Sequence, residues 1–204
     1  KGAKPAPLRQ ARTELPSDNE LMAAVKNGDL EKLADLYEKY NRPLFAFFYK
    51  MTSDSQASED LVQVVFCKIL AYRDRYRDKE GTFAVWLFQI ARNARIDHFH
   101  KEKYLKNAAD VDELEIKSDS DTAGDYERME KARRMREALN GLTEVQRETL
   151  ILSRFNGLSY EEIAAIMNCR VGTIKARVFR AMETGKRFLF RTAAAIIPAL
   201  FGLA

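Results

Sequence analysis

Polar and basic side chains suited to DNA contact cluster near the C-terminal end of the chain. They begin at Arg170 and continue along an expected helix with Thr173, Lys175, Arg177 and Arg180. An arginine or lysine can donate to guanine O6 and N7 in the major groove, which discriminates between bases by about 1–3 kcal/mol. Phosphate contacts from the same side chains add affinity that depends on salt but not on sequence. The chemistry expected of this stretch is recognition of duplex DNA.

Two short helices joined by a tight turn are expected to position these side chains. Ser159 followed by Glu162 is a capping box, which predicts a helix start at Ser159. Asn168 and Cys169 form the corner, and the helix after them has apolar residues inside and basic residues outside. This arrangement is a helix-turn-helix, whose second helix enters the major groove. An ordinary helical hairpin with a solvated basic face is the alternative interpretation.

Bulk composition fits a soluble protein with a mild preference for polyanions. The chain has 204 residues, a net charge of +4 and a pI of about 9.0, with 46% hydrophobic and 31% charged residues. Cys67 and Cys169 stand far apart and suggest no disulfide framework, which indicates a reducing cytosol. The first residues lack the apolar core of a secretory signal. No nucleophile–base set, phosphate-binding glycine loop or zinc spacing points to an enzyme or a cofactor.

Hydrophobic periodicity predicts helices along most of the chain, and no stretch alternates with the period of two typical of strands. The expected fold class is therefore all-α. In the first half we expect a helix from Ser17 or Asp18 to Asn27, a helix from Asp29 that Pro43 interrupts, a buried helix over 44–51, a helix from Ser55 or Ser58 to about Arg73, and a helix from Thr82 to about Lys103.

Changes in composition divide the chain into two small helical domains joined by an acidic, flexible linker. The expected parts are a disordered arm (1–16), a first domain (17–104), the linker (105–125), a second domain (126–187) and an apolar tail (188–204). The linker is either a solvated spacer or a polyanion mimic that lies in a basic channel. The tail is short for a membrane span. It can pack on the second domain, lie on a membrane surface or bind a partner.

Three stretches in this order resemble a bacterial RNA polymerase sigma factor of the extracytoplasmic-function (ECF) group of the sigma-70 family. They are SEDLVQVVFCKIL at 58–70, FAVWLFQIARNARIDHFHK at 83–101 and LTEVQRETLILSRFNGLSYEEIAAIMNCRVGTIKARVFRA at 142–181. Many regulators carry a segment like the third, so the ordered set with an acidic linker between the second and third is the specific signal. The resemblance covers about residues 18–187.

The resemblance implies that the two domains have different binding functions. A sigma-2-like domain (17–104) binds core polymerase and opens the −10 element, and a sigma-4-like domain (126–187) reads the −35 element as duplex. The family's linker runs through the active-site and RNA-exit region, which favours the polyanion mimic. Implied partners are the β′ clamp helices and β subunit of the core, promoter DNA and an anti-sigma factor, without a small-molecule substrate or cofactor. The implied location is cytoplasmic, at the nucleoid when active or at the inner membrane when an anti-sigma factor holds the protein there.

The first stretch matches the family segment that binds the clamp helices of β′. The matching residues are Asp60, Gln63 and Phe66. Asp60 and Gln63 are three apart and share a helix face, and an acid suits a basic coiled-coil partner. A capped, solvated helix start is the alternative. Val64 departs from the family, which usually has an acid there, and this change either weakens core binding or substitutes a hydrophobic contact.

The second stretch matches the family segment that opens the −10 element. Asn93 matches the position associated with capture of a flipped base, a task that needs a polar group at the base edge and apolar walls. The resemblance assigns phosphate contacts to Arg92, Arg95, His98 and Lys101.

Trp86 and the two histidines of this stretch also have other interpretations. Trp86 can stack on DNA, but its helical phase favours a place in the core. His98 and His100 are two apart, on different helix faces and without a third ligand, so a metal site is not expected.

The third stretch matches the family's −35-binding segment. The residues implied are Arg170, Thr173, Lys175, Arg177 and Arg180, with Lys175 and Arg180 at positions that meet the element. Ala176 replaces a frequent serine. Arg170 stands where serine or proline is common, so the second helix lacks a good N-cap, and Arg170 can instead reach a phosphate.

Two other functions compete with this interpretation. A free-standing helix-turn-helix regulator could use the N-terminal helices to sense a ligand or to dimerise, and an enzyme is the third hypothesis. A regulator does not need the segments around Asp60 and Asn93, and it should retard duplex promoter DNA without core polymerase.

Overall fold

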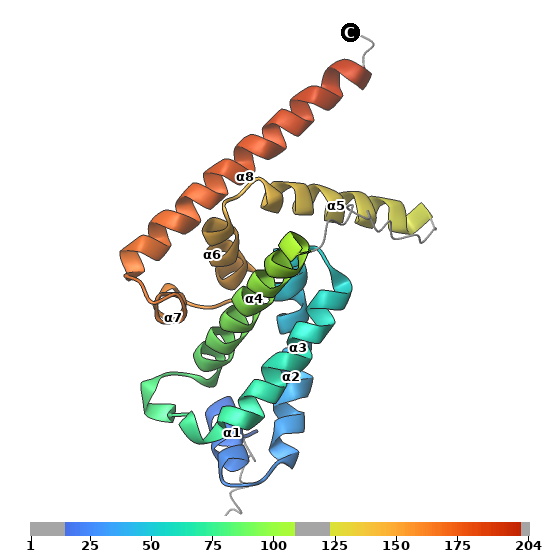
Figure 1. Ribbon diagram of the computed structural model, residues 1–204. Helices are drawn as coiled ribbons and strands as arrows, with labels where there is room; N and C mark the ends of the chain where they lie inside the picture. The colour runs from blue at the N-terminus through green and yellow to red at the C-terminus, as the bar shows by residue number, and fades with distance from the viewer. Residues whose placement is uncertain (1–14, 109–122, 201–204) are drawn as a thin grey trace, which may run out of the picture.

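The structure is a computed structural model that describes the backbone of residues 15–108 and 123–200 (Figure 1). Its helices are α1 (Asp18–Lys26), α2 (Glu31–Thr52), α3 (Ser55–Tyr72), α4 (Phe83–Ala108), α5 (Ala123–Asn140), α6 (Glu144–Arg154), α7 (Tyr160–Ile166) and α8 (Val171–Leu200), with single 3₁₀ turns at Arg73–Arg75 and Asp78–Glu80. No strand occurs in the described ranges, and the all-α prediction is confirmed. The predicted arm lies almost wholly outside those ranges, as does most of the predicted linker.

Side-chain caps define where several helices begin. Capping boxes join Ser17 to Glu20 at α1, Thr143 to Gln146 at α6 and Ser159 to Glu162 at α7. The box expected at Ser159 is therefore present. At α3 the cap is Asp54, whose side chain accepts from the backbone N–H of Ala57 at 3.0 Å, rather than Ser55 or Ser58. Each cap satisfies a backbone donor that would otherwise lack a partner in its helix.

The prediction that Pro43 interrupts the second helix is wrong, because α2 runs through this residue without a break. A proline inside a helix removes one backbone hydrogen bond and costs about 3 kcal/mol. Leu44, Phe47 and Phe48 follow directly and are at most 1% exposed. Burying a side chain of this size stabilises a fold by about 1.5–3 kcal/mol. The buried face of α2 therefore outweighs the lost bond.

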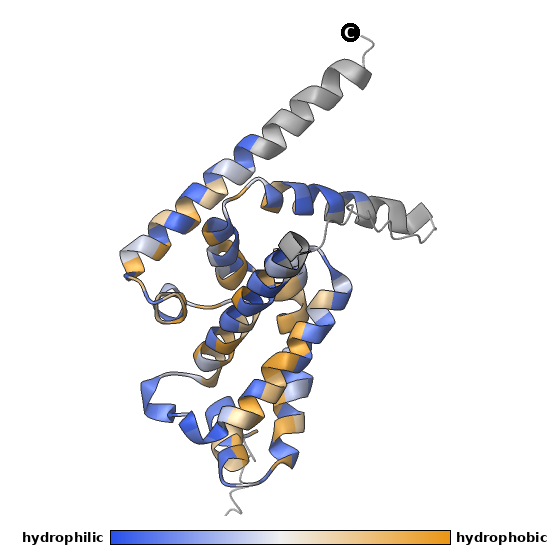
Figure 2. Cartoon of the chain, in the orientation of Figure 1, coloured by the Kyte–Doolittle hydropathy of each residue, from blue (hydrophilic) through white to orange (hydrophobic). Residues whose placement is uncertain are grey.

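One hydrophobic core runs through the N-terminal and C-terminal helices. In the first half its fully buried members include Met22, Leu36, Phe47 and Leu87, and in the second half they include Ile151, Leu152 and Ile163. Figure 2 shows the apolar residues gathered where α2, α3 and α4 lie together. Helix α7 packs on α4, and α6 packs on α2. The two helical bodies predicted from composition are thus in direct contact.

Helix α8 continues to Leu200 and extends beyond the body formed by the other helices (Figure 1). Its last part belongs to the predicted apolar tail. The side chains of 188–200 lie outside the described set, and so the question of what this tail contacts stays a prediction. Within the described residues, none of the helices has the length and apolarity needed to cross a membrane.

Candidate protein and nucleic-acid interfaces

The corner between α7 and α8 has the geometry of a helix-turn-helix. Asn168 adopts the left-handed conformation with φ of 47°, and the N–H of Cys169 donates to the carbonyl of Ala164 at 3.0 Å. Asparagine tolerates this conformation better than most residues. Beneath the corner, Ile174 is fully buried and Val178 is 4% exposed. Packing of these two residues turns the opposite side of α8 outward.

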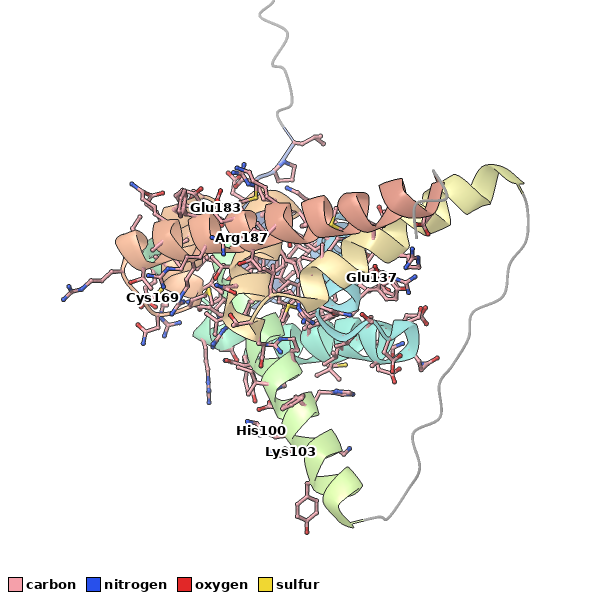
Figure 3. All side chains as sticks on the ribbon, turned by 90° about the horizontal axis from the view of Figure 1, so that it is seen from above. His100, Lys103, Glu137, Cys169, Glu183 and Arg187 are labelled. Atoms are coloured by element: carbon pink, nitrogen blue, oxygen red, sulfur yellow. The ribbon has the colours of Figure 1, made fainter. Side chains whose placement is uncertain are left out.

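The outward side of α8 carries the predicted DNA-contacting residues. Arg170, Lys175 and Arg180 are exposed, whereas Thr173 and Arg177 are half-buried. The guanidinium of Arg177 lies 3.6 Å from Cys169 Sγ in the turn. Arg170 directly precedes α8, and its carbonyl accepts from the N–H of Thr173 at 2.9 Å. Figure 3 shows α8 from above, with Cys169 at the turn and Glu183 and Arg187 farther along the helix.

An exposed aromatic side chain also lies on this helix and was missed by the sequence analysis. Phe179 is 68% exposed, immediately before Arg180. A large apolar side chain on a basic helix can contact the methyl group of thymine in the major groove. Its position between Val178 and Arg180 in the periodic pattern was the available signal.

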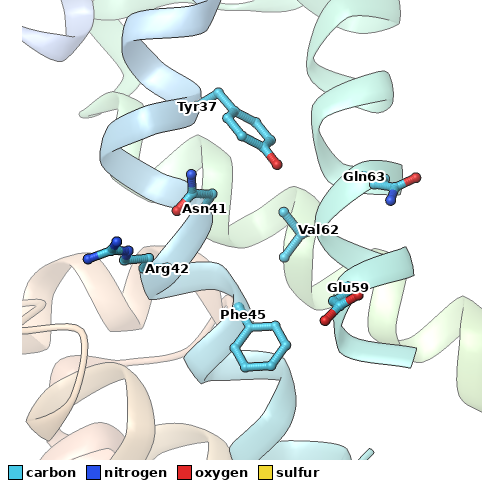
Figure 4. Close-up of a pocket in the computed structure, with 7 residues that line it drawn as sticks. All are labelled: Tyr37, Asn41, Arg42, Phe45, Glu59, Val62 and Gln63. Carbon is cyan, nitrogen blue, oxygen red and sulfur yellow. The ribbon is translucent and has the colours of Figure 1, made fainter. Parts of the chain in front are cut away.

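The outer side of α3 presents Asp60 and Gln63 to solvent, with Val64 41% exposed beside them. Gln63 borders a groove of about 370 Å³ between α2 and α3 (Figure 4). In this view Tyr37, Asn41 and Phe45 line the α2 side, and Glu59, Val62 and Gln63 line the α3 side. The same face continues into a second, shallower hollow bordered by Asp60, Val64 and Cys67.

Phe66 does not lie on this face. Its side chain is 8% exposed and packs edge-on against Tyr37, with ring centroids 4.8 Å apart. In this conformation Phe66 supports the face from inside the core and does not present itself to a partner.

A pocket of about 450 Å³ opens between α3 and α4 around Asn93. Its lining residues are Lys68, Tyr72, Arg75, Trp86, Ile90, Asn93 and Asp97. Lys68 Nζ lies 2.9 Å from Asp97 Oδ2 across the pocket, and the Arg75 guanidinium lies 5.0 Å from the centre of the Tyr72 ring. The pocket therefore combines an exposed amide, aromatic walls and two cations, of which Lys68 is paired with the Asp97 carboxylate. Aromatic rings and cations are groups that hold an unstacked base.

The place in the core that the sequence favours for Trp86 is confirmed in part, whereas its stacking on DNA stays a prediction. Its ring is half-buried and packs against Tyr76 and Phe83, at centroid distances of 5.2 and 6.3 Å. The same side chain lines the Asn93 pocket. Three of the lining residues come from α3 and the turn after it, namely Lys68, Tyr72 and Arg75. The sequence pattern of the α4 stretch alone could not indicate them.

Comparison with known proteins relates the two halves of the chain to one family. Residues 36–114 match sigma-70 region 2, and residues 132–184 match sigma-70 region 4. RNA polymerase sigma-H factor of Pseudomonas aeruginosa is 30% identical over 175 residues, which cover 81% of this chain and 90% of that protein. The ECF RNA polymerase sigma-E factor of Escherichia coli strain K12 is 30% identical over 176 residues, which cover 82% and 91%. This chain belongs to the sigma-70 family of RNA polymerase sigma factors, in its ECF group.

A solved structure shows that this sigma factor is similar to a known one in tertiary structure as well as in sequence. The sigma factor RpoE of Bartonella quintana, crystallised with the anti-sigma factor NepR, is 30% identical, with a TM-score of 0.64 over 78% of this chain and 97% of that chain. As an ECF sigma factor, the protein binds core RNA polymerase, recognises the −35 and −10 promoter elements and promotes DNA melting at initiation. The region 2 match falls mainly on α2–α4, and the region 4 match on α5–α8.

The two arginines predicted to hold −10 phosphates are engaged inside the sigma factor itself. Arg95 is 6% exposed, and its Nη1 lies 2.7 Å from Glu144 Oε1 of α6. Glu148, 1% exposed, has its Oε1 3.3 Å from Arg92 Nε and 3.7 Å from Arg95 Nη2. Two carboxylates of region 4 thus form ion pairs with these two arginines of region 2. Nothing in the sequence patterns indicated this contact.

The remaining predicted −10 residues lie farther along α4. His98 is half-buried and Lys101 is exposed. This end of α4, with His100 and Lys103, projects away from the body (Figure 3). In the part of the chain that the structure describes, no three histidine, cysteine or carboxylate side chains gather where a metal ion could bind.

Proposed function

We propose that Asn93 and its pocket hold a base of the −10 element outside the stack. The exposed amide can read the base edge, and the Tyr72 and Trp86 rings can stack on the base. Lys68 and Arg75 bring positive charge to the same pocket, which suits the adjoining phosphates. This grouping of an amide, two aromatic rings and two cations in one pocket is the observation that carries the proposal.

The phosphates next to this base are contacted by Arg92, Arg95, His98 and Lys101. Lys101 is exposed on the projecting end of α4 and can reach the strand directly. Arg92 and Arg95 need to leave Glu148 before they can do so.

Region 4 reads the −35 element as duplex through the outward side of α8. Lys175 and Arg180 contact base edges, and Arg170, Thr173 and Arg177 contact phosphates. The exposure of Arg170, Lys175 and Arg180 supports this assignment.

Core polymerase docks on the outer side of α3, where the β′ clamp helices contact Asp60 and Gln63. Val64 adds an apolar contact in place of the acid usual in the family, since it is exposed directly after Gln63. Phe66 contributes indirectly, by packing under this face against Tyr37.

The β subunit of the core docks on an apolar groove of about 280 Å³ between α5, α6 and α8. Met135 and Met182 border this groove and are 47% and 38% exposed, so a partner helix could bury both. Met135→Lys should therefore weaken binding of the sigma factor to core polymerase. Equal affinity in a core-binding titration would exclude the groove as a contact.

An anti-sigma factor controls the protein, as the complex of the similar Bartonella quintana sigma factor with NepR suggests. We place the sigma factor in the cytoplasm, at the nucleoid when active or at the inner membrane through its anti-sigma factor. We also propose that it catalyses no reaction itself.

Runoff transcription with purified sigma-free core polymerase on a promoter library tests the proposal. We expect sigma-dependent transcripts whose promoters share −35 and −10 elements. Asn93→Ala should reduce initiation about fivefold to 150-fold, the loss expected when a base-edge contact of about 1–3 kcal/mol is removed. Asn27→Ala, at the exposed C-cap of α1, is the matched control and should leave initiation unchanged. Absence of any sigma-dependent transcript would overturn the proposal, and retardation of duplex promoter DNA without core would favour a free-standing regulator.

A further inference from the structure

The far end of α4, beyond the Asn93 pocket, carries exposed aromatic and basic side chains. His100, Lys101, Lys103 and Tyr104 all lie at the surface, and Tyr104 is 74% exposed. Figure 3 shows this end of the helix, with His100 and Lys103, projecting away from the body. Exposed rings interleaved with cations are typical of surfaces that bind single-stranded nucleic acid, because bases stack on the rings and phosphates pair with the cations.

The helical register places two of these aromatic residues in line with the Asn93 pocket. An α-helix turns about 100° per residue, so the positions of His100 and Tyr104 lie within about 20° of Asn93 around the axis of α4. Arg92 and Arg95 lie about 100° or more from this line, and their side chains pair with α6 instead. A strand whose base enters the Asn93 pocket can therefore continue along α4 over both rings.

The spacing of these two rings suits a single base. His100 and Tyr104 are four residues apart on one face, which separates them by about 6 Å along the axis. A flat base stacked between two rings needs about 6.8 Å, which is twice the stacking distance of 3.4 Å, and a small rotation of either side chain supplies the difference. Phe99 packs edge-on against His100, with ring centroids 6.3 Å apart, and so restricts rotation of that ring.

Positive charge prevails around the two rings. Lys101 and Lys103 are exposed, and Glu102 is the one acid in the sequence of residues 98–104. Asp97, one turn earlier on the helix, is paired with Lys68. These charges suit phosphates. In a duplex the neighbouring bases cover each base face, so rings that need a free face favour a melted strand over a duplex.

We propose that His100 and Tyr104 form a second base-binding site on α4, in which one base of the melted −10 strand stacks between their rings. Lys101 and Lys103 hold the adjoining phosphates. This inference rests on the proposed role of the Asn93 pocket. The two rings lie about 10 and 16 Å from Asn93 along the axis of α4, which corresponds to about two to five nucleotides at 3.4 Å or more each.

The second site tolerates any base, because every base has a face that can stack on an aromatic ring. It therefore adds affinity for the melted strand and no preference for a promoter sequence. Its binding energy is available only after the duplex has opened, so this site favours melting over binding of the closed duplex.

A scan with the fluorescent base 2-aminopurine, whose emission changes when it stacks, tests this site. Holoenzyme made from the full chain and core polymerase binds single-stranded −10 oligonucleotides that carry one 2-aminopurine at successive positions. We expect emission changes at two separated positions. Asn93→Ala should remove one of them, and His100→Ala and Tyr104→Ala should each remove the other. Each ring variant should also weaken strand binding at least about fivefold, which corresponds to about 1 kcal/mol for one stacking contact.

Three further variants separate stacking from charge and from general effects on the fold. Tyr104→Phe keeps the ring and should keep both the emission change and the affinity. Lys103→Ala should weaken binding and reduce the salt slope by about 1, without moving the emission change to another position. Leu30→Ala alters a side chain that is 52% exposed at the start of α2, so it is the control and should change neither quantity.

The proposal is wrong if no second position responds, or if its response survives both His100→Ala and Tyr104→Ala. It is equally wrong if Tyr104→Ala weakens assembly with core polymerase and leaves the emission unchanged, because this face of α4 would then contact protein. A missing response at the Asn93-dependent position alone would count against the proposed base pocket, while the position that depends on Tyr104 still decides the second site.

Discussion

Lys68 Nζ lies 2.9 Å from Asp97 Oδ2 and joins α3 to α4 beside the Asn93 pocket. Both side chains are partly solvated, at 30% and 69% exposed, so the pair contributes at most about 1 kcal/mol to stability. Its larger effect is electrostatic, because Asp97 places a negative charge where a phosphate strand is expected.

Asp97→Asn should therefore tighten binding of a single-stranded −10 oligonucleotide by roughly twofold to fivefold, because it removes a charge that repels phosphate. Fluorescence anisotropy over a range of salt concentrations measures this, and the gain should shrink at high salt. Asp35→Asn, which breaks an exposed pair with Lys32 away from the pocket, is the control and should have no effect. Weaker binding by Asp97→Asn would mean that Asp97 itself contacts the DNA.

Lys175→Ala should weaken binding of the −35 duplex by the holoenzyme and relax preference at the base it meets, by about 1–3 kcal/mol. Arg170→Ala, which removes a proposed phosphate contact, should instead lower affinity for all sequences and reduce the salt slope by about 1. Lys32→Ala, on α2 and paired with Asp35, serves as the control. Unchanged affinity in both test variants would show that this side of α8 does not face the duplex.

Pro43→Ala should raise the free energy of unfolding by about 1–3 kcal/mol. The replacement restores a backbone N–H inside α2 and removes the steric conflict of the ring with the preceding turn. Urea unfolding followed by far-ultraviolet circular dichroism measures the change. A less stable variant would show that the neighbouring buried aromatic residues depend on the backbone geometry that proline imposes.

Alkaline pH should destabilise the fold through Tyr76. Burial raises the pKa of this phenol to about 12, with added repulsion from Asp78 and Asp18. The pKa of a tyrosine in the unfolded chain is near 10, so between about pH 10 and pH 12 the unfolded state loses a proton that the folded state keeps. The free energy of unfolding should therefore fall as pH rises through this window. Denaturant titrations at several pH values measure the fall, and it should be smaller in Tyr76→Phe.

Local patterns were sufficient for the helices and for the helix-turn-helix. Ser159 and Glu162 are three residues apart and bond to each other in the structure as their spacing predicts, because a capping box forms within a single turn. The burial of Ile174 and Val178 likewise follows from their periodic spacing. The family relationship also came from contiguous stretches, and the comparisons confirm it.

These patterns could not predict contacts between residues that are far apart in the sequence. Phe66 matches a partner-binding position by sequence, but the packing of α2 on α3 places its ring against Tyr37 in the core. The pocket around Asn93 needs Tyr72 and Arg75 from the end of α3, and their approach depends on the angle at which two helices cross.

Local patterns predict which segments are helical and which helix carries the basic outward side, because capping and periodicity act within a few turns of chain. The two DNA-binding regions of a sigma factor were predicted from the resemblance of contiguous stretches to that family. Long-range packing was needed to show that α2 continues through Pro43 and that Glu148 meets Arg92 and Arg95. Both result from apolar burial between segments far apart in sequence, and a helical period specifies which face is buried but not which partner covers it.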